Sequence, residues 1–435
     1  MKWFSQKTKP PKESPGNDEQ SYSFAQKVGR FFSAEPQKEK VLQHEDFQAA
    51  GDVYYANISA SYKVIQRILW LFFVFFMVIT IITNYNSITY DNFFYLIKDF
   101  SGAVDHGNVK YETLSYESDS RQNFVLYRGG LATVSPSKLS IFTATGRRTL
   151  NTTSGFSSPY AVSSNKYVLI YDSSGTTFSV YNAFARVYTE TLDYPVTNAC
   201  LAQDGSFIIV TRSADSKSLI YFYNKNFHRI AEIRADYYIF DIEMDTDRNL
   251  TTLLSYDIGD GTGRSTLSVY DTSRMVKQKE LTKIHSISLE GEFPISCGFL
   301  DNNTFAVITN RCVRIFDSDF TQQEISTDYS EGNITGYHLT GEGVAVAVSL
   351  SSKNLVVAFD KYGNLLYNNS VSYTVSDLAV FGNYLFLQTE QDVTKVNCKN
   401  EVEQRLESGR GKLLIYNEKT VLVCGESKAE YLIFD

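Results

Sequence analysis

Residues 267–271 read Leu267-Ser268-Val269-Tyr270-Asp271, and this pattern of alternating apolar residues, an aromatic residue and then Asp or Asn recurs from residue 138 onward. We call it the blade motif. Successive copies are 37 to 47 residues apart, and a spacing near 40 in a chain of short strands is typical of β-propeller blades. The first copy has Thr after its aromatic residue, and the seventh has Val in place of one. The motif positions of the eight copies are Phe142, Tyr181, Tyr223, Tyr270, Phe316, Phe359, Val396 and Phe434.

The residues between the motifs supply the other strands of each blade. Polar turns such as Gln203–Gly205 and Asp245–Asp247 are expected to join an innermost strand A to a strand B. The expected B strands are the most apolar, as in Phe207–Val210 and Val344–Val348, which suits a strand covered on both faces by neighbouring blades. The motif would then end strand C. The sequence therefore predicts an all-β fold, an eight-bladed β-propeller.

The two ends of the repeat predict how the ring closes. The chain stops at the end of the last strand C, so the eighth blade lacks an outer strand. Residues Val109–Tyr116 alternate and precede the first blade, and we expect them to supply that strand and remove an exposed edge. A seven-bladed ring is the alternative, because the first unit, Phe124–Asn151, is the least regular.

A second feature lies ahead of the repeat. Fourteen of the fifteen residues from Ile68 to Ile82 are apolar, and 23 residues from Ile68 to Tyr90 pass without a charge. This length suits a bilayer, and Trp70 lies where interfacial aromatic residues are found. The sequence predicts a transmembrane helix at 68–83. A cleaved signal peptide is disfavoured, because the apolar run begins far from the N-terminus and no A-x-A site follows.

The charges beside this segment predict its orientation. The N-terminal flank has Lys63 and Arg67 against Asp52, whereas the C-terminal flank has one Lys against two Asp. The positive-inside rule then makes residues 1–67 a cytoplasmic tail, disordered at first and then helical. Residues 84–108 are expected to be a linker. Residues 109–435 are expected to form an extracytoplasmic propeller, held at the outer side of the cell membrane.

Composition and the absence of known motifs limit the classes of function that the sequence supports. Residues 1–67 hold 10 Lys and Arg against 8 Asp and Glu, and the chain's net charge is −8, so the remainder carries −10. A net-acidic domain argues against a nucleic-acid partner. The five cysteines form no C-x-x-C pair, so we expect buried thiols and no metal site. No H-E-x-x-H, G-x-S-x-G or Walker pattern occurs, so no catalytic residue and no cofactor is predicted.

Aromatic residues offer the candidate binding site. Each lies just ahead of, or at the start of, an expected strand A, in the connection from the previous strand D. They would share one face of the ring with the B–C loops, and aromatic rings with polar tips suit recognition of a peptide or a sugar. For each single ring, sealing one blade against the next is the alternative role. The residues are Phe156, Tyr160, Tyr194, Tyr237, Tyr238, Phe293, Tyr329 and Tyr373.

In organisation, with a tail, one span and a Tyr-rich propeller, the chain resembles a bacterial family of single-pass membrane-anchored propellers of unknown function. It is similar to quinoprotein-like and WD-type propellers in architecture only, because its blades lack Trp-Asp dipeptides and docking tryptophans. The resemblance implies membrane anchoring and a module that binds a protein or a cell-wall glycan outside the membrane. A wall-directed hydrolase or lyase, or a sensor coupled to the tail, remains the alternative.

Overall fold

In the computed structural model the chain forms two compact units. The predicted disordered tail before residue 47, the predicted linker and the beginning of the predicted closing strand lie outside the described residues. Those described are 47–83 and 113–434, except Ser120, Asp260, 276–280, Asn302, 323–327, Glu331 and Ser352.

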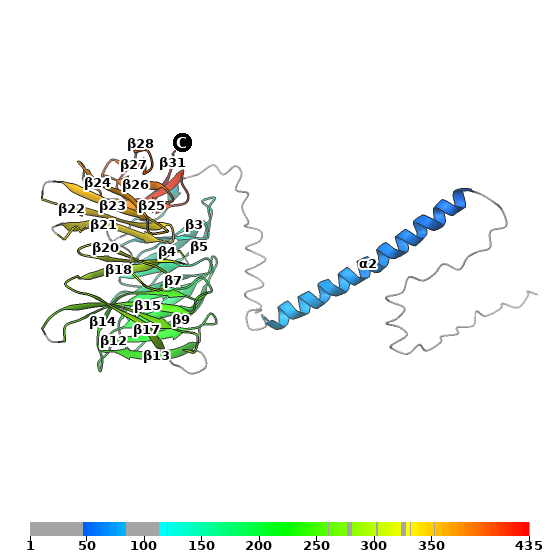
Figure 1. Cartoon of the computed structure of the whole chain (residues 1–435), viewed down its shortest axis with the longest axis horizontal. Coiled ribbons are helices and arrows are strands. Elements are labelled where there is room, and N and C mark those ends of the chain that lie inside the picture. The colour runs from blue at the N-terminus through cyan, green and yellow to red at the C-terminus, as the bar shows by residue number, and fades with distance from the viewer. Residues whose placement is uncertain are drawn as a thin grey trace, which may run out of the picture. The chain divides into compact units, whose positions relative to one another are not determined.

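The first unit contains one long helix, α2, which runs from Phe47 to Thr83 (Figure 1). Its 37 residues correspond to about 55 Å. Within it, Tyr62–Ile82 has a mean hydropathy of 2.3 and is long and apolar enough to cross a membrane. The apolar side chains from Leu69 to Ile82 are exposed, as a lipid-facing helix requires. The predicted helix is confirmed.

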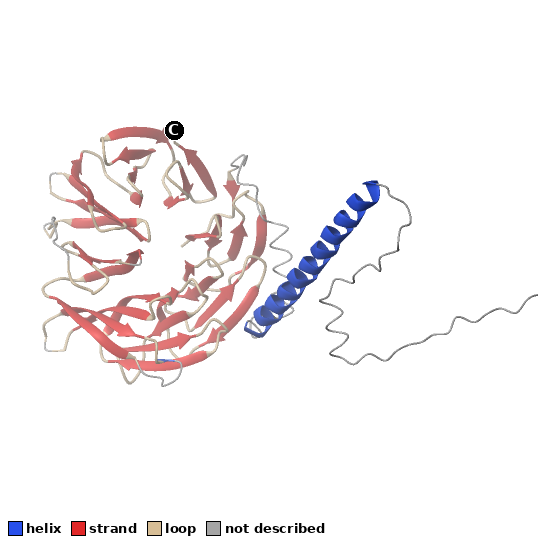
Figure 2. Ribbon diagram, turned by 45° about the vertical axis from the view of Figure 1, so that its right-hand side comes forward, coloured by secondary structure: helices blue, strands red, loops and turns tan. Residues whose placement is uncertain are grey.

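The second unit is a ring of eight antiparallel sheets arranged around a central axis (Figure 2). Each sheet is one blade, and its strands follow the chain from the axis outward. The first four blades are β2(Asn123–Tyr127), β3(Gly130–Val134), β4(Lys138–Phe142) and β5(Arg148–Thr153); β6(Pro159–Ser163), β7(Val168–Asp172), β8(Thr177–Tyr181) and β9(Arg186–Thr191); β10(Val196–Leu201), β11(Phe207–Thr211), β12(Ser218–Tyr223) and β13(Arg229–Ala235); β14(Tyr238–Asp245), β15(Leu250–Asp257), β16(Arg264–Asp271) and β17(Thr282–Leu289).

The remaining four blades continue the ring, and the last combines both ends of the repeat. They are β18(Pro294–Asp301), β19(Thr304–Thr309) and β20(Val313–Phe316); β21(Asn333–Thr340), β22(Gly343–Ser349), β23(Asn354–Asp360) and β24(Leu365–Val371); β25(Asp377–Phe381), β26(Tyr384–Gln388), β27(Asp392–Asn397) and β28(Val402–Glu407); β29(Lys412–Ile415), β30(Thr420–Cys424), β31(Lys428–Ile433) and β1(Leu114–Ser115).

The blade motif is explained by where it lies. All eight motif positions lie within one residue of the end of the third strand, and all are buried between blades. Radially arranged blades diverge away from the axis, so the wider space at the third strand needs a large side chain. The ring of Tyr223, for example, stacks on that of Phe207 with a centroid distance of 4.5 Å. The predicted B strands, such as β11 and β22, are buried along their length, which confirms that both faces are covered.

The Asp or Asn after the motif shapes the turn to the outer strand. Asp360 Oδ1 accepts hydrogen bonds from the backbone N–H groups of Tyr362 and Asn364, at 2.9 and 2.8 Å. Asn224 makes the same pair of contacts with Asn226 and His228. Such side-chain acceptors replace backbone partners in a tight turn. The motif therefore encodes a core contact and a turn together.

The ring closes as the sequence predicted. Strand β1 pairs antiparallel with β31, with Leu114 opposite Ala429 and Ser115 opposite Lys428. The backbone N–H of Tyr116 donates to Ser427 O at 3.0 Å, and its hydroxyl donates to Gly425 O at 2.7 Å. The side chains of Leu114 and Tyr116 are buried, so the closing segment contributes to the core as well as to the sheet.

The irregular blade is not the one that the sequence indicated. The first unit forms a complete four-stranded sheet, β2–β5, so the seven-bladed alternative is wrong. The three-stranded sheet is the fifth, β18–β20. Isolated bridges join Cys312 to Asp328 and Phe316 to Gln322 on either side of residues 323–327, which are not described. A blade motif alone cannot show whether the fourth strand of its blade, which follows the motif, is regular.

Candidate functional site

The eight predicted aromatic residues fall into two groups. Five seal the space between blades: Phe156 and Tyr329 are buried, and Tyr194, Tyr237 and Tyr373 pack half-buried against inter-blade clusters. The other three are exposed, namely Tyr160, Tyr238 and Phe293. Their exposure separates rings that are available to a partner from rings that the fold already uses.

Two of the sealing rings, Tyr329 and Tyr237, are also held by polar contacts at their tips. Tyr329 is 2% exposed, and its hydroxyl donates to the carbonyl oxygen of Thr309 at 3.1 Å. The hydroxyls of Tyr237 and Tyr270 are 3.2 Å apart, which ties the start of the fourth blade to its own blade motif. A buried tyrosine that is both packed and hydrogen-bonded has little left to offer a ligand.

Two of the exposed rings line a hollow of about 470 Å³ at the third, fourth and fifth blades. We call it the aromatic hollow. Within it, the ring of Phe293 is 5.0 Å from that of Phe240 and 5.0 Å from that of Tyr256. Phe240 is 36% exposed and Phe293 42%. The lining residues are Thr197, Arg212, Lys217, Ser218, Tyr238, Ile239, Phe240, Tyr256, Ile258 and Phe293.

The local backbone explains why these rings face outward. The pairing of β14 with β15 shifts register between Ile239 and Asp241, so Phe240 is the extra residue of a β-bulge. A bulge re-aims the side chain that it carries. The backbone N–H of Phe293, at the entrance to β18, donates to Asn310 Oδ1 at 2.7 Å, which fixes that connection. Tyr256, the last residue but one of β15, pairs with Tyr238.

Among the residues that the structure describes, two basic residues and no acidic residue line the aromatic hollow. Lys217 is ion-paired with Asp257, which raises the pKa of the lysine and lowers that of the carboxyl group. Its ammonium group lies 5.7 Å from the centre of the Tyr238 ring. Arg212 is exposed and makes no ion pair with a residue that the structure describes. The hollow is therefore apolar with a basic edge.

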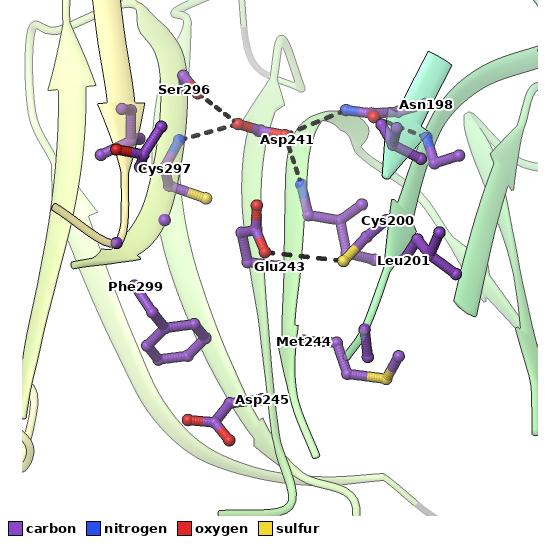
Figure 3. A pocket seen from close by; sticks show the side chains of 18 of the residues that line it. Asn198, Cys200, Leu201, Asp241, Glu243, Met244, Asp245, Ser296, Cys297 and Phe299 are labelled. Carbon is purple, nitrogen blue, oxygen red and sulfur yellow. Dashed lines mark hydrogen bonds between the residues drawn. The ribbon is translucent and has the colours of Figure 1, made fainter. Parts of the chain in front are cut away.

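A cavity of about 880 Å³ occupies the central channel beside the aromatic hollow, and Phe240 lines both. Inner strands of six blades contribute to its wall. Asp241 and Glu243 of β14 project into it, as Figure 3 shows. Asp245, Asp247 and Asp301 also line it, whereas no Lys, Arg or His does. The channel wall is therefore acidic, in contrast to the edge of the hollow.

Asp241 ties three blades together (Figure 3). Its Oδ2 accepts from Ser296 Oγ at 2.6 Å and from the backbone N–H of Cys297 at 2.9 Å, both in the fifth blade. Its Oδ1 accepts from Asn198 of the third blade and from its own neighbour Ile242. Burial raises the pKa of this carboxyl group, and these hydrogen bonds oppose the increase.

An aspartate with the same arrangement of hydrogen bonds lies in the seventh blade. Asp377 accepts from the backbone N–H of its neighbour Leu378 at 3.0 Å and from that of Leu413 in the eighth blade at 2.8 Å. In both blades an aspartate near the start of strand A caps its own strand and the next one. We infer that these aspartates are structural ties, because both oxygens are already occupied.

Glu243 lies two residues further along β14, and its carboxyl group is more weakly hydrogen-bonded than that of Asp241. Its nearest side-chain partner is the thiol of Cys200, whose Sγ is 3.7 Å from Oε2. Burial and the neighbouring Asp241 raise the pKa of Glu243 to about 8. Burial, followed by the charge of Glu243, raises the pKa of the Cys200 thiol well above its usual range, so this cysteine is unreactive.

The described residues limit the chemistry of this channel. Within them, no group of three or more His, Cys, Asp and Glu side chains is placed to hold a metal ion. Asp241 is committed to inter-blade bonds, which leaves Glu243 without a second available carboxylate beside it. Paired acid–base chemistry requires two groups that are free to exchange protons. The channel is therefore a weaker candidate for function than the aromatic hollow.

Sequence reasoning found Tyr238 and Phe293 but missed Phe240, Tyr256 and the channel carboxylates. The predicted strand order placed the first two in connections between blades. Phe240 lies inside a strand and is turned outward by a bulge, for which the sequence carries no sharp signal. The alternation of Asp241 and Glu243 was visible, but which face of β14 points to the axis depends on the closed ring.

Solved structures with the same architecture confirm the fold. Sqt1 from Saccharomyces cerevisiae has a TM-score of 0.54 at 13% identity, covering 75% of this chain and 99% of that one. The Dos1 propeller has a TM-score of 0.52 at 11% identity, with coverage of 76% and 98%. BamB from Moraxella catarrhalis has a TM-score of 0.50 at 12% identity, with coverage of 74% and 100%. At these identities the likeness concerns the fold alone.

A comparison with curated protein sequences finds no match to this chain. One protein-family description does match, over residues 106–431, which is nearly the whole propeller and most of the chain. The chain therefore belongs to DUF5711, a family of unknown function.

Proposed function

We propose that this protein is a membrane-anchored extracytoplasmic propeller that binds a protein partner through the aromatic hollow. The observation that carries the proposal is the exposure of Phe240 and Phe293, which pack on each other and on the half-buried Tyr256 at the junction of the fourth and fifth blades. Aromatic residues are enriched among the residues that dominate the free energy of protein–protein binding.

The arrangement of the rings favours a protein over a glycan. The interplanar angles are 83° between Phe240 and Phe293, 79° between Phe240 and Tyr256, and 64° between Tyr256 and Phe293. Rings that meet edge to face do not form one flat platform on which a sugar could stack. They form an irregular apolar recess instead, which suits a branched or aromatic side chain of a partner.

The membrane part of the proposal rests on α2 and its flanks. The helix provides one segment that is long and apolar enough to span a bilayer. Lys63 and Arg67 precede the apolar core, and the positive-inside rule assigns that end to the cytoplasm. The propeller would then be held beside the outer surface of the membrane, where its loop face meets a partner.

The test replaces two exposed rings and follows binding and stability together. Phe240→Ala combined with Phe293→Ala is expected to lower partner capture by more than tenfold, because truncating one central interface aromatic costs about 2 kcal/mol or more. The melting temperature should change little, since both rings are more than one third exposed. Capture is measured by crosslinking on intact membranes, and melting on the purified full chain.

Two control variants show whether a loss of capture is specific to the aromatic hollow and how the loss of a buried ring affects melting. Lys361→Gln with Tyr362→Ala removes an exposed ring and a nearby cation from a C–D turn, on the opposite face of the ring, and should leave capture unchanged. Tyr329→Ala should lower the melting temperature, because losing a buried aromatic side chain costs about 3–5 kcal/mol. Unchanged capture by the Phe240 and Phe293 variant would refute binding at the hollow.

A further inference from the structure

The electrostatic character of the aromatic hollow differs from that of its surroundings. Residues 68–435 carry a net charge of −10, and the neighbouring channel is lined by five carboxylates and no cation. The described lining of the hollow nevertheless contains Arg212 and Lys217 and no Asp or Glu. A local basic edge on an acidic domain selects for the charge of what binds there.

The two cations are not equivalent. Lys217 already has a carboxylate partner in Asp257, and the charge of Asp236 also acts on it. Its contribution to the field at the hollow is therefore largely cancelled. Arg212 is exposed and has no ion pair among the described residues, so its charge is available. A guanidinium group can also bind a carboxylate through two parallel hydrogen bonds.

We propose that the aromatic hollow binds a segment of a protein partner in which a bulky apolar side chain is flanked by an acidic residue. This rests on the proposed function, since it specifies the partner at the same hollow. The apolar side chain occupies the recess between Phe240, Tyr256 and Phe293. The acidic residue lies toward Arg212, away from the carboxylates of the channel. A basic segment would lose this contact and meet Arg212 with like charge.

The experiment uses the full chain in nanodiscs of zwitterionic lipid and three fluorescein-labelled peptides. The peptides share a Leu-Phe-Leu core and carry two flanking Glu, Gln or Lys residues on each side. Binding is followed by fluorescence anisotropy at low salt. The Glu peptide is expected to bind about two- to fivefold more tightly than the Gln peptide, and the Lys peptide most weakly, as an exposed charge pair allows.

Two variants separate the charge from the recess. Arg212→Gln should bind the Glu and Gln peptides equally while still binding both. Phe240→Ala with Phe293→Ala should lose all three peptides. Lys217 is left intact, because its removal would free Asp257 and add a repulsive charge. Raising the salt from about 0.1 M to about 1 M shortens the Debye length from about 10 Å to about 3 Å and should remove the preference.

The outcomes distinguish the two proposals. Equal binding of the Glu and Gln peptides by the parent chain, with loss in the Phe240 and Phe293 variant, would overturn the acidic preference and leave the hollow as a binding site. A preference for Glu that survives Arg212→Gln would also overturn it. Binding that persists after truncation of both rings would show that the peptides do not bind at the aromatic hollow. Failure of all three peptides to bind would show that the hollow does not take a linear segment.

Discussion

Deletion of residues 109–116 is expected to make the propeller aggregate. The deletion removes β1, so the backbone of β31 around Lys428 and Ala429 loses its antiparallel partner. It also removes the buried side chains of Leu114 and Tyr116, which cover an apolar cluster between the eighth and first blades. Unpaired strand edges and exposed apolar surface both promote association between chains.

The measurement is size-exclusion chromatography and thermal melting of the detergent-solubilised full chain. A deletion of equal length in the predicted linker, residues 96–103, controls for shortening of the chain. A milder variant, Leu114→Ala, should lower the stability by about 2–5 kcal/mol without removing the strand. If the 109–116 deletion remains monodisperse and melts like the linker deletion, β1 does not close the ring.

Replacement of Glu243 by Gln is expected to stabilise the propeller at pH 8 and to have no effect at pH 4. The carboxyl group ionises near its usual pKa of 4.5 in the unfolded chain and near about 8 in the folded protein. Between these values the folded protein retains a proton that the unfolded chain has lost, so stability falls as the pH rises. Gln does not ionise, so the variant does not lose stability in this way as the pH rises.

The expected gain is large because the two pKa values are far apart. One pKa unit corresponds to about 1.4 kcal/mol, so the gain at pH 8 is on the order of 3–5 kcal/mol, or several degrees in melting temperature. Melting curves of the parent chain and the variant at pH 4, 6 and 8 provide the measurement. The exposed Glu426, replaced by Gln in the turn between β30 and β31, is the control. A difference that is independent of pH would show that Glu243 is not held protonated by burial.

Sequence reasoning succeeded where the signal is local. The blade motif combines an apolar residue at the end of a strand with a turn residue, and the turn depends only on neighbours in the chain, as the contacts of Asp360 show. Closure by the segment that contains Leu114 also followed from strand order. Eight copies of one motif therefore predicted eight blades, although the motif said nothing about the irregular outer part of the fifth blade.

The candidate site was harder to predict because it depends on contacts between blades. Tyr329 and Phe293 occupy similar connections, yet one is 2% exposed and the other 42%. The difference lies in how closely the adjoining blade approaches, which a single sequence does not report. The rings of Phe240, Tyr256 and Phe293 come from three separate segments and meet through a bulge and a blade interface. Their grouping is a property of the folded ring.

Site-specific photo-crosslinking in living, wall-stripped cells tests the central claim most directly. A photoreactive phenylalanine analogue is placed at position 240 in the aromatic hollow or at position 362 on the opposite face, where Tyr362 is 59% exposed. We expect a discrete crosslinked protein from position 240, none from position 362, and digestion of that product by protease added outside the cells. A product formed equally from position 362, or one that external protease cannot reach, would contradict it.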